Sequence, residues 1–130
     1  MSDSATVDIF ISYSSKDRER ARAFATALTD LGWSVWWDRH IPTGKTYFEV
    51  IEEALTAARC VLVLWSSHSV QSSWVIEEAE QGRNRGILLP VFLENVSPPM
   101  GFRLVQAIDL SHWQGDISER EFQRLIAGHL

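Results

Sequence analysis

Short apolar runs alternate with amphipathic segments along this chain, and this alternation limits the folds that it can adopt. Val7–Tyr13 (VDIFISY) and Cys60–Trp65 (CVLVLW) are almost unbroken apolar runs, as is typical of strands buried on both faces. Three further strand-like runs are Trp33–Trp37, Ile87–Leu93 and Val105–Leu110. Strands that alternate with helices are joined by crossovers, which make the sheet parallel. The sequence therefore predicts an α/β, flavodoxin-like five-stranded parallel sheet of order 2-1-3-4-5, with helices on both faces.

Capping residues mark where the first two predicted helices begin and end. Ser14 or Ser15 offers an N-cap for the first helix, and Gly32 ends its amphipathic pattern. Thr46 and Glu49 form a capping box at the start of the second helix. Each of these two helices is therefore predicted to follow a strand after a short connection.

The C-terminal half carries three more expectations. A helix is predicted over Ser73–Arg85, and a last helix over Ser118–His129, with Ser118 and Glu121 as its cap. Pro90 lies within the fourth strand-like run. Because proline has no N–H to donate to a ladder, it predicts an edge position or a bulge for that strand.

Length and charge indicate how many domains the chain forms and which partners it can bind. With 130 residues and 45% hydrophobic content, residues 1–130 are predicted to form a single domain, with residues 1–6 as a flexible lead. We expect this domain to be the N-terminal part of a longer protein. The net charge of −5 provides no basic stripe for a nucleic-acid backbone, so nucleic acid is not an expected partner.

The cellular compartment is predicted from what the sequence lacks. No apolar stretch approaches the ~18 residues of a membrane span, and the N-terminus lacks the pattern of a signal peptide. Cys60, the only cysteine, lies in an apolar run, which fits a reducing compartment. We therefore expect a cytoplasmic protein that does not bind membranes.

The segment Ser66–Glu80 (SSHSVQSSWVIEEAE) follows the third strand-like run and opens a helix. In open α/β sheets ligands bind at the carboxyl ends of the strands, where this segment would lie. Trp74 and Glu78 are four residues apart, so on a helix they share one face. An indole and a carboxylate that border one cleft are the predicted functional centre. The simpler alternative is that Glu77, Glu78 and Glu80 only complement the helix dipole.

Three other chemistries fit the residues less well. Gly44-Lys45-Thr46 matches the end of a phosphate-binding P-loop, but Arg39 stands where the motif needs a glycine. A response-regulator receiver needs a phospho-accepting aspartate at the end of its third strand, where this chain has Trp65 and Ser66. The histidines have no spacing that places two on one metal, so no metal site is predicted. They are His40, His68, His112 and His129.

Three segments resemble the three signature segments of the Toll/interleukin-1 receptor (TIR) domain, and a fourth resembles its last-strand region. They are IFISYSSKDR, GWSVWWDRHIPTGK, LVLWSSHSVQSSWVIEEAE and GFRLVQAIDLSHW, in that order along nearly the whole chain. The sequences of these segments are most similar to those of bacterial members of the family. The resemblance implies a flavodoxin-like fold whose second loop, here Asp38–Lys45, mediates self-association with other TIR domains and gates a cleft.

The resemblance also implies an activity. Enzymatic members of the family, some in bacterial immune systems, cleave NAD+ at the nicotinamide glycosidic bond and release nicotinamide with ADP-ribose or a cyclised product. Their essential glutamate lies four residues after a helix tryptophan, which implies Glu78 as the catalytic residue and Trp74 as the aromatic beside it. NAD+ is then the substrate, without a separate cofactor. The alternative is a non-catalytic module that binds other TIR domains.

Topology and resemblance together suggest further substrate-binding residues. They are Tyr13, Ser14, Ser15, Trp36, Asp38, Arg39, Lys45, Phe48, Ser66 and Ser69. Some eukaryotic relatives have basic residues where this chain has Ser14 and Ser15, so Arg39 and Lys45 are the candidates for holding the diphosphate. The family typically completes its site from a neighbouring protomer. We therefore expect a weakly active isolated domain that head-to-tail assembly switches on.

Overall fold

Residues 7–39 and 43–129 are described by a computed structural model of the chain. The expected flexible lead, residues 1–6, and part of the Asp38–Lys45 loop lie outside the described residues. The strands are β1 (Ile9–Ser12), β2 (Val35–Trp36), β3 (Val61–Trp65), β4 (Leu88–Phe92) and β5 (Ile108–Asp109). The helices are α1 (Arg18–Asp30), α2 (Tyr47–Ala57), α3 (Ser73–Asn84) and α4 (Arg120–His129), with short 3₁₀ turns η2 (Ser15–Asp17) and η3 (Ser69–Gln71).

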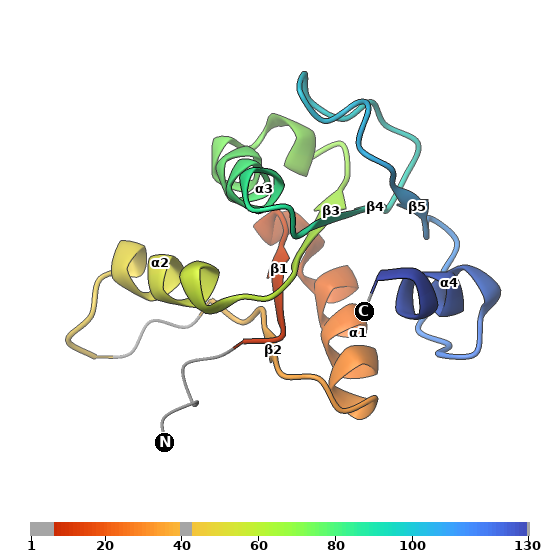
Figure 1. The fold of residues 1–130 in the computed structure, drawn as a ribbon, viewed down its shortest axis with the longest axis horizontal. Helices are drawn as coiled ribbons and strands as arrows, with labels where there is room; N and C mark the ends of the chain where they lie inside the picture. Colours follow the sequence, from red (N-terminus) through yellow and green to blue (C-terminus); the bar gives the residue numbers. More distant parts are fainter. Residues whose placement is uncertain (1–6, 40–42, 130) are drawn as a thin grey trace.

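The strands form one five-stranded parallel sheet of order β2-β1-β3-β4-β5. Helices α1 and α4 cover one face of this sheet, and α2 and α3 cover the other (Figure 1). The predicted flavodoxin-like α/β fold and its strand order are confirmed. The order reverses between β1 and β3, which lie side by side at the centre, and ligands of open α/β sheets bind beyond the carboxyl ends of such a pair.

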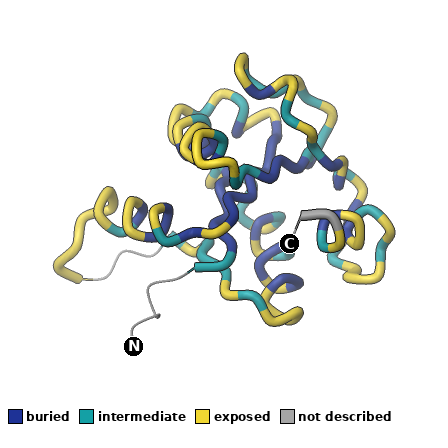
Figure 2. Tube along the Cα trace, in the orientation of Figure 1, coloured by how far each residue is buried: buried dark blue, intermediate teal, exposed yellow. Residues whose placement is uncertain are grey.

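The face under α1 and α4 packs into one continuous apolar core. Its strand residues are Ile9, Ile11, Leu62, Leu64, Leu89, Val91 and Ile108. Phe24 of α1 lies against the Trp113 ring, with 4.6 Å between the ring centroids. Trp113 also stacks on Phe122 of α4 at 4.7 Å. Figure 2 shows the buried central strands in dark blue beneath helices whose outer sides are exposed.

The face under α2 and α3 is divided into two smaller apolar clusters. The cluster at α2 contains Phe10, Ile51, Ala54, Leu55, Ala58 and Val61. The cluster at α3 contains Val63, Trp65, Val75, Ala79 and Phe102. Ser12 follows Phe10 on the same side of β1, pairs with Val63 of β3 and is fully buried. A buried polar residue therefore lies where the two clusters meet.

The two outer strands are shorter than the sequence suggested. The runs Trp33–Trp37 and Val105–Leu110 pair over only two residues each, as β2 and β5. An outer strand has a neighbour on one side only, so its ends gain few ladder bonds. Among the described residues, no helix combines the length and hydropathy needed to cross a bilayer.

Pro90 lies in β4, which has β3 on one side and β5 on the other, so the prediction of an edge position or a bulge is wrong. The Leu93 N–H bonds to β3, whereas the Phe92 carbonyl accepts from the Leu110 N–H. Because alternate residues of a strand bond to opposite neighbours, the Pro90 nitrogen faces the β5 side. Pairing with β5 begins only at Val91, so the missing N–H removes no ladder bond.

One helix start and one helix end follow the expected capping chemistry. The Thr46 hydroxyl accepts from the Glu49 N–H at 3.1 Å, and the Glu49 carboxylate accepts from the Thr46 N–H at 2.9 Å, so the capping box is present. Gly32 has a φ of 106°, as expected for a glycine just past a helix end. Ser14 is also a cap, but of the 3₁₀ turn η2, and α1 begins after it at Arg18.

The expected cap of α4 by Ser118 and Glu121 is wrong. The helix begins two residues after Ser118, whose hydroxyl donates to Asp116 at 2.7 Å. The Glu119 carboxylate accepts from the Phe122 N–H at 3.0 Å instead. The sequence pattern could not distinguish these two starts, because a side-chain acceptor is available at both positions.

Candidate functional site

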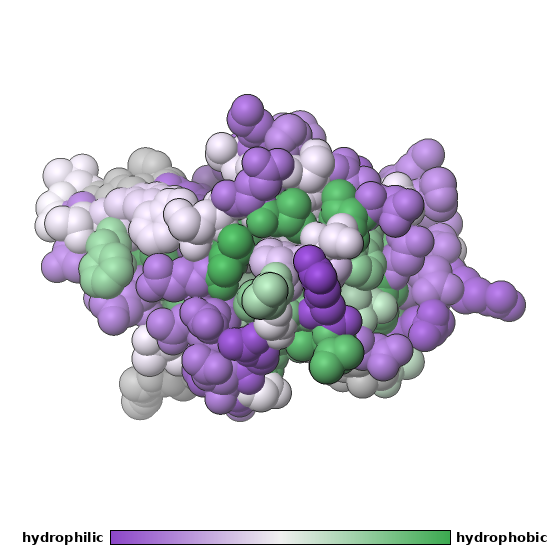
Figure 3. Space-filling model, turned by 90° about the horizontal axis from the view of Figure 1, so that it is seen from above, coloured by the Kyte–Doolittle hydropathy of each residue, from purple (hydrophilic) through white to green (hydrophobic). Residues whose placement is uncertain are grey.

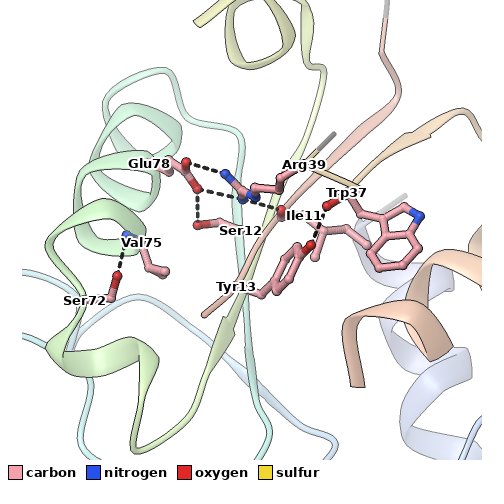
Figure 4. Close-up of polar contacts among 8 residues, drawn as sticks. All are labelled: Ile11, Ser12, Tyr13, Trp37, Arg39, Ser72, Val75 and Glu78. Carbon is pink, nitrogen blue, oxygen red and sulfur yellow. Dashed lines mark hydrogen bonds and ion pairs between the residues drawn. The ribbon is translucent and has the colours of Figure 1, made fainter. Parts of the chain in front are cut away.

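Helix α3 carries the two residues that the sequence singled out. The Ser72 hydroxyl caps the helix by accepting from the Val75 N–H at 3.3 Å, and this fixes where its first turn begins. Trp74 then lies in the first turn and Glu78 one turn later, on the side that faces β1 (Figure 4). The cap therefore determines that the Glu78 carboxylate points towards the sheet.

The Glu78 carboxylate is almost inaccessible and accepts three hydrogen bonds. Ser12 Oγ donates to its Oε1 at 2.7 Å. Arg39 donates from Nη1 to Oε2 at 2.8 Å and from Nη2 to Oε1 at 3.1 Å. The Glu78 side chain is only 3% exposed and that of Arg39 14%. The negative charge of Glu78 is thus paired with the Arg39 guanidinium (Figure 4).

The Arg39 guanidinium lies against aromatic rings as well as the carboxylate. Its central carbon is 5.3 Å from the Phe10 ring centroid and 5.1 Å from those of Tyr13 and Trp36. Arg39 Nη2 also donates to the Ile11 carbonyl at 3.0 Å. Burial disfavours the charged form of Arg39. The hydrogen bonds and the negative charge of Glu78 outweigh this effect and raise the pKa of Arg39.

A cavity of about 300 Å³ opens beside this ion pair. Its lining residues are Tyr13, Ser14, Ser15, Arg18, Arg39, Tyr47, Ser72, Trp74 and Glu78. An adjoining hollow of about 70 Å³ also borders Trp74 and Glu78 and adds Phe48. The predicted shared opening of indole and carboxylate is therefore present. A roomier hollow of about 870 Å³ lies along α2 and does not include Glu78.

Aromatic side chains form the walls of the cavity. Trp74 is 42% exposed and packs against the Tyr47 ring, with 5.4 Å between centroids. The Tyr13 hydroxyl donates to the Trp37 carbonyl at 2.6 Å. Burial raises the pKa of Tyr13, although the nearby Arg39 and Arg18 lower it in part. Tyr13 therefore stays neutral and acts as a hydrogen-bond donor at neutral pH.

Three of the expected substrate-binding residues do not line the cavity. Trp36 stacks on Phe10, with 4.9 Å between centroids, and its ring centroid is 5.1 Å from the guanidinium carbon of Arg39. Asp38 pairs with Arg18 at 3.3 Å. Lys45 pairs with a carboxylate of α2, Glu53, at 3.1 Å. Of the two basic residues suggested for a diphosphate, only Arg39 is at the cavity.

Ser66 and Ser69 do not reach the cavity. They are 1% and 0% exposed, and their hydroxyls bond inside the molecule. Ser66 Oγ donates to the Asp17 carboxylate at 2.5 Å, and Ser69 Oγ donates to the Leu64 carbonyl at 2.7 Å. These bonds hold the turn after β3 in place, so the arrangement gives no support to the expected sugar contact.

The sequence analysis missed four residues of the site: Ser12, Arg18, Tyr47 and Ser72. Ser12 had a detectable signal, because it is a polar residue within the apolar run Val7–Tyr13 and a buried hydroxyl needs a partner. Ser72 lies within the segment Ser66–Glu80 already placed at this edge, whereas nothing in the local sequence indicated Arg18 or Tyr47. Among the described residues, no group of three or more His, Cys, Asp or Glu side chains could hold a metal ion.

The fold and the site together define a class: a parallel α/β domain with a buried acid–arginine pair and an aromatic-walled cavity at the carboxyl ends of β1 and β3. A family model described as "TIR domain" matches residues 9–126. The chain therefore belongs to the TIR domain family. A search of curated proteins finds no match.

Solved structures of TIR domains share the fold. The TIR domain of the Toll-related receptor TRR-2 from Hydra magnipapillata superposes with a TM-score of 0.80 at 18% identity, covering 94% of this chain and 97% of that one. A TIR-STING receptor from C. gigas gives 0.72 at 24%, covering 96% and 41%. The TIR domains of the activated Roq1 resistosome give 0.68 at 19%, covering 94% and 98%.

Proposed function

We propose that this TIR domain is an NAD+ nucleosidase that cleaves the nicotinamide N-glycosidic bond in bacterial immune signalling. The products would be nicotinamide and ADP-ribose or a cyclic ADP-ribose isomer. The observation that carries the proposal is the Glu78 carboxylate, which borders the same cavity as Trp74 at the carboxyl edge of the sheet. Glu78 provides the negative charge that the reaction needs, and Trp74 provides a flat surface on which a ring can stack.

A single carboxylate suits this reaction. When the bond between the ribose C1′ and the nicotinamide nitrogen breaks, its electron pair stays on nicotinamide, which leaves as a neutral molecule. No general acid is needed for that departure. The ribose is left as an oxocarbenium ion, which the Glu78 carboxylate stabilises electrostatically. Water then adds to C1′ and loses a proton, or a nucleophilic atom of the adenosine part of the same molecule adds to C1′ in its place to form the cyclic product.

The size of the cavity supports activation by self-assembly. About 300 Å³ is at the lower end of the roughly 300–1,000 Å³ found for small-molecule sites, enough for part of a dinucleotide. The remainder of NAD+ would then contact a neighbouring protomer, through the Asp38–Lys45 loop that the family resemblance implies. Mixing a Glu78→Ala chain with a chain that has an intact Glu78 but a substituted loop tests this. If no mixture regains NAD+ cleavage, the proposal of a site shared between protomers is wrong.

Nicotinamide release from NAD+ by concentrated protein is the direct test. Glu78→Gln should lose about 100-fold or more of the activity, as expected for the loss of one electrostatic group at a reacting centre. The matched control is Glu77→Gln, because Glu77 is the exposed neighbour and shares the same helix. Equal losses from both variants would mean that Glu78 has no special role.

A non-catalytic module that binds other TIR domains is the second candidate. It is favoured by the pairing of Glu78 with Arg39, which leaves the carboxylate no free charge. Exposed apolar side chains also suit an interaction surface; they are Phe48, Trp74, Met100 and Leu104. Figure 3 shows apolar surface in separate patches on a mostly hydrophilic face. Self-association without nicotinamide release at any protein concentration would favour this candidate.

A further inference from the structure

The ion pair between Arg39 and Glu78 differs from the other ion pairs among the described residues. Its two side chains are 14% and 3% exposed, whereas every other pair joins side chains that are 34–81% exposed. Removing two charges from water is costly, and a buried pair adds little stability over apolar residues of the same shape. The pair therefore calls for an explanation other than stability.

The surroundings of the guanidinium form a site for a flat organic cation. Three aromatic rings, those of Phe10, Tyr13 and Trp36, lie within 5.1–5.3 Å of its central carbon. The Glu78 carboxylate lies at its edge, 2.8 Å from Nη1. Ring faces and a carboxylate are the groups that bind a delocalised cation in proteins. A guanidinium meets that description, and so does a pyridinium ring.

The pair is also open to the cavity. Arg39 and Glu78 both line the space of about 300 Å³ whose other walls include Trp74 and Ser14. Arg39 Nε is buried and has no hydrogen-bond partner among the described residues. A purely structural pair would be expected to have all its donors satisfied. Here the cation lies where a ligand entering the cavity would reach it.

We propose that Arg39 is an internal stand-in for the cationic end of the substrate, and that its guanidinium must leave Glu78 before that end can bind. This inference rests on the proposed function of the same site. The nicotinamide ring of NAD+ carries a positive charge, and the ribose gains one as the bond breaks. Both would need the carboxylate that Arg39 now neutralises. The resting domain is thus self-inhibited by one side chain.

Binding of 1-methylnicotinamide, a pyridinium cation that cannot be cleaved at a glycosidic bond, tests the inference without turnover. Tryptophan fluorescence or ligand-observed NMR would compare wild type with Arg39→Ala. We expect Arg39→Ala to bind this cation about tenfold more tightly, since the site between the aromatic rings and the carboxylate becomes free. The affinity for neutral nicotinamide should increase much less. Adding Glu78→Gln to Arg39→Ala should abolish the gain.

The matched control is Arg22→Ala. Arg22 also lies over an indole, with its guanidinium carbon 5.3 Å from the Trp37 ring, and pairs with a carboxylate, but it does not line the cavity. It should bind the cation as wild type does. An unchanged affinity in folded Arg39→Ala would overturn the inference, as would an equal gain in Arg22→Ala.

A second measurement covers the case in which Arg39→Ala folds poorly. Millimolar ethylguanidinium, which restores the lost group, should raise the melting temperature of Arg39→Ala above that in equimolar ethylammonium. Equal melting temperatures in the two salts would contradict a guanidinium-shaped site. The proposed function fails separately: if NAD+ is never cleaved but Arg39→Ala gains cation binding, the site stands without the enzyme. If wild type cleaves NAD+ but the gain is missing, only the inference is wrong.

Discussion

The two faces of the sheet are built differently from the same strands. Under α1 and α4, side chains from all the inner strands join one continuous apolar core that ends in the Phe24, Trp113 and Phe122 stack. Under α2 and α3, the apolar residues form two clusters, and the buried Ser12, Glu78 and Arg39 fill the junction between them. One face therefore provides stability, and the other can hold charge in a buried position.

Alternation along β1 accounts for this difference. Ile9 and Ile11 point to the continuous core, whereas Phe10 and Ser12 point to the divided face. Successive residues of a strand face opposite sides of the sheet, so one polar residue changes only one face. The Ser12 hydroxyl thus provides a polar group on the divided face without weakening the continuous core on the opposite face.

The strongest test of the comparison is truncation on the continuous face. Phe122→Ala should lower the free energy of unfolding by about 3–5 kcal/mol, because Phe122 is fully buried and its loss leaves a large cavity. Leu55→Ala on the divided face should cost nearer 2 kcal/mol, since Leu55 lies at the margin of a small cluster and is 8% exposed. Urea unfolding measures both. Equal losses would mean that the two faces contribute alike.

The polar junction itself is tested next, by comparing removal of one charge with replacement of both. Glu78→Ala leaves the Arg39 guanidinium buried without its carboxylate and should cost about 3 kcal/mol of unfolding free energy. Replacing both residues by methionine should return the stability close to that of wild type, because the charges leave together. A double variant as unstable as Glu78→Ala would show that the pair is needed for stability, and would weaken the case for a functional role.

The continuous face was the more predictable of the two. The unbroken apolar runs of β1 and β3 predict strands buried on both faces, the apolar period of α1 predicts a helix packed on them, and the strand order follows from alternating strands and helices. The Trp74–Glu78 spacing also placed both residues correctly on one helix face. The arrangement of Arg39 could not be predicted, because it depends on a contact between residues 39 positions apart in the chain. Ser66 and Ser69 looked available for the same reason: sequence does not show that their hydroxyls already bond internally.

A smaller effect is expected at the start of α2, on the divided face. Thr46→Ala removes one half of the capping box and should cost about 1 kcal/mol of unfolding free energy. The backbone and side-chain hydrogen bonds with Thr46 lower the pKa of Glu49, so this part of the box is lost as pH falls through that lowered value. Hydrogen exchange should therefore show faster opening of α2 than of α1 in Thr46→Ala. Uniformly faster exchange in both helices would mean that the two faces unfold together.

The smallest effect comes from Cys60, in the continuous core. Burial raises the pKa of its thiol to about 12, so the folded protein keeps the neutral thiol where the unfolded chain begins to ionise. The folded-state pKa is the higher one, so this stabilisation is complete below the unfolded value of about 8.5 and is lost as pH rises towards 12. Between pH 7 and pH 9 the loss should be about 0.8 kcal/mol relative to Cys60→Ala, which has no thiol to ionise. Urea unfolding of both chains at the two pH values measures the difference. A constant difference between the two stabilities would indicate that water reaches Cys60, and that the core under α1 and α4 is less well sealed than its packing indicates.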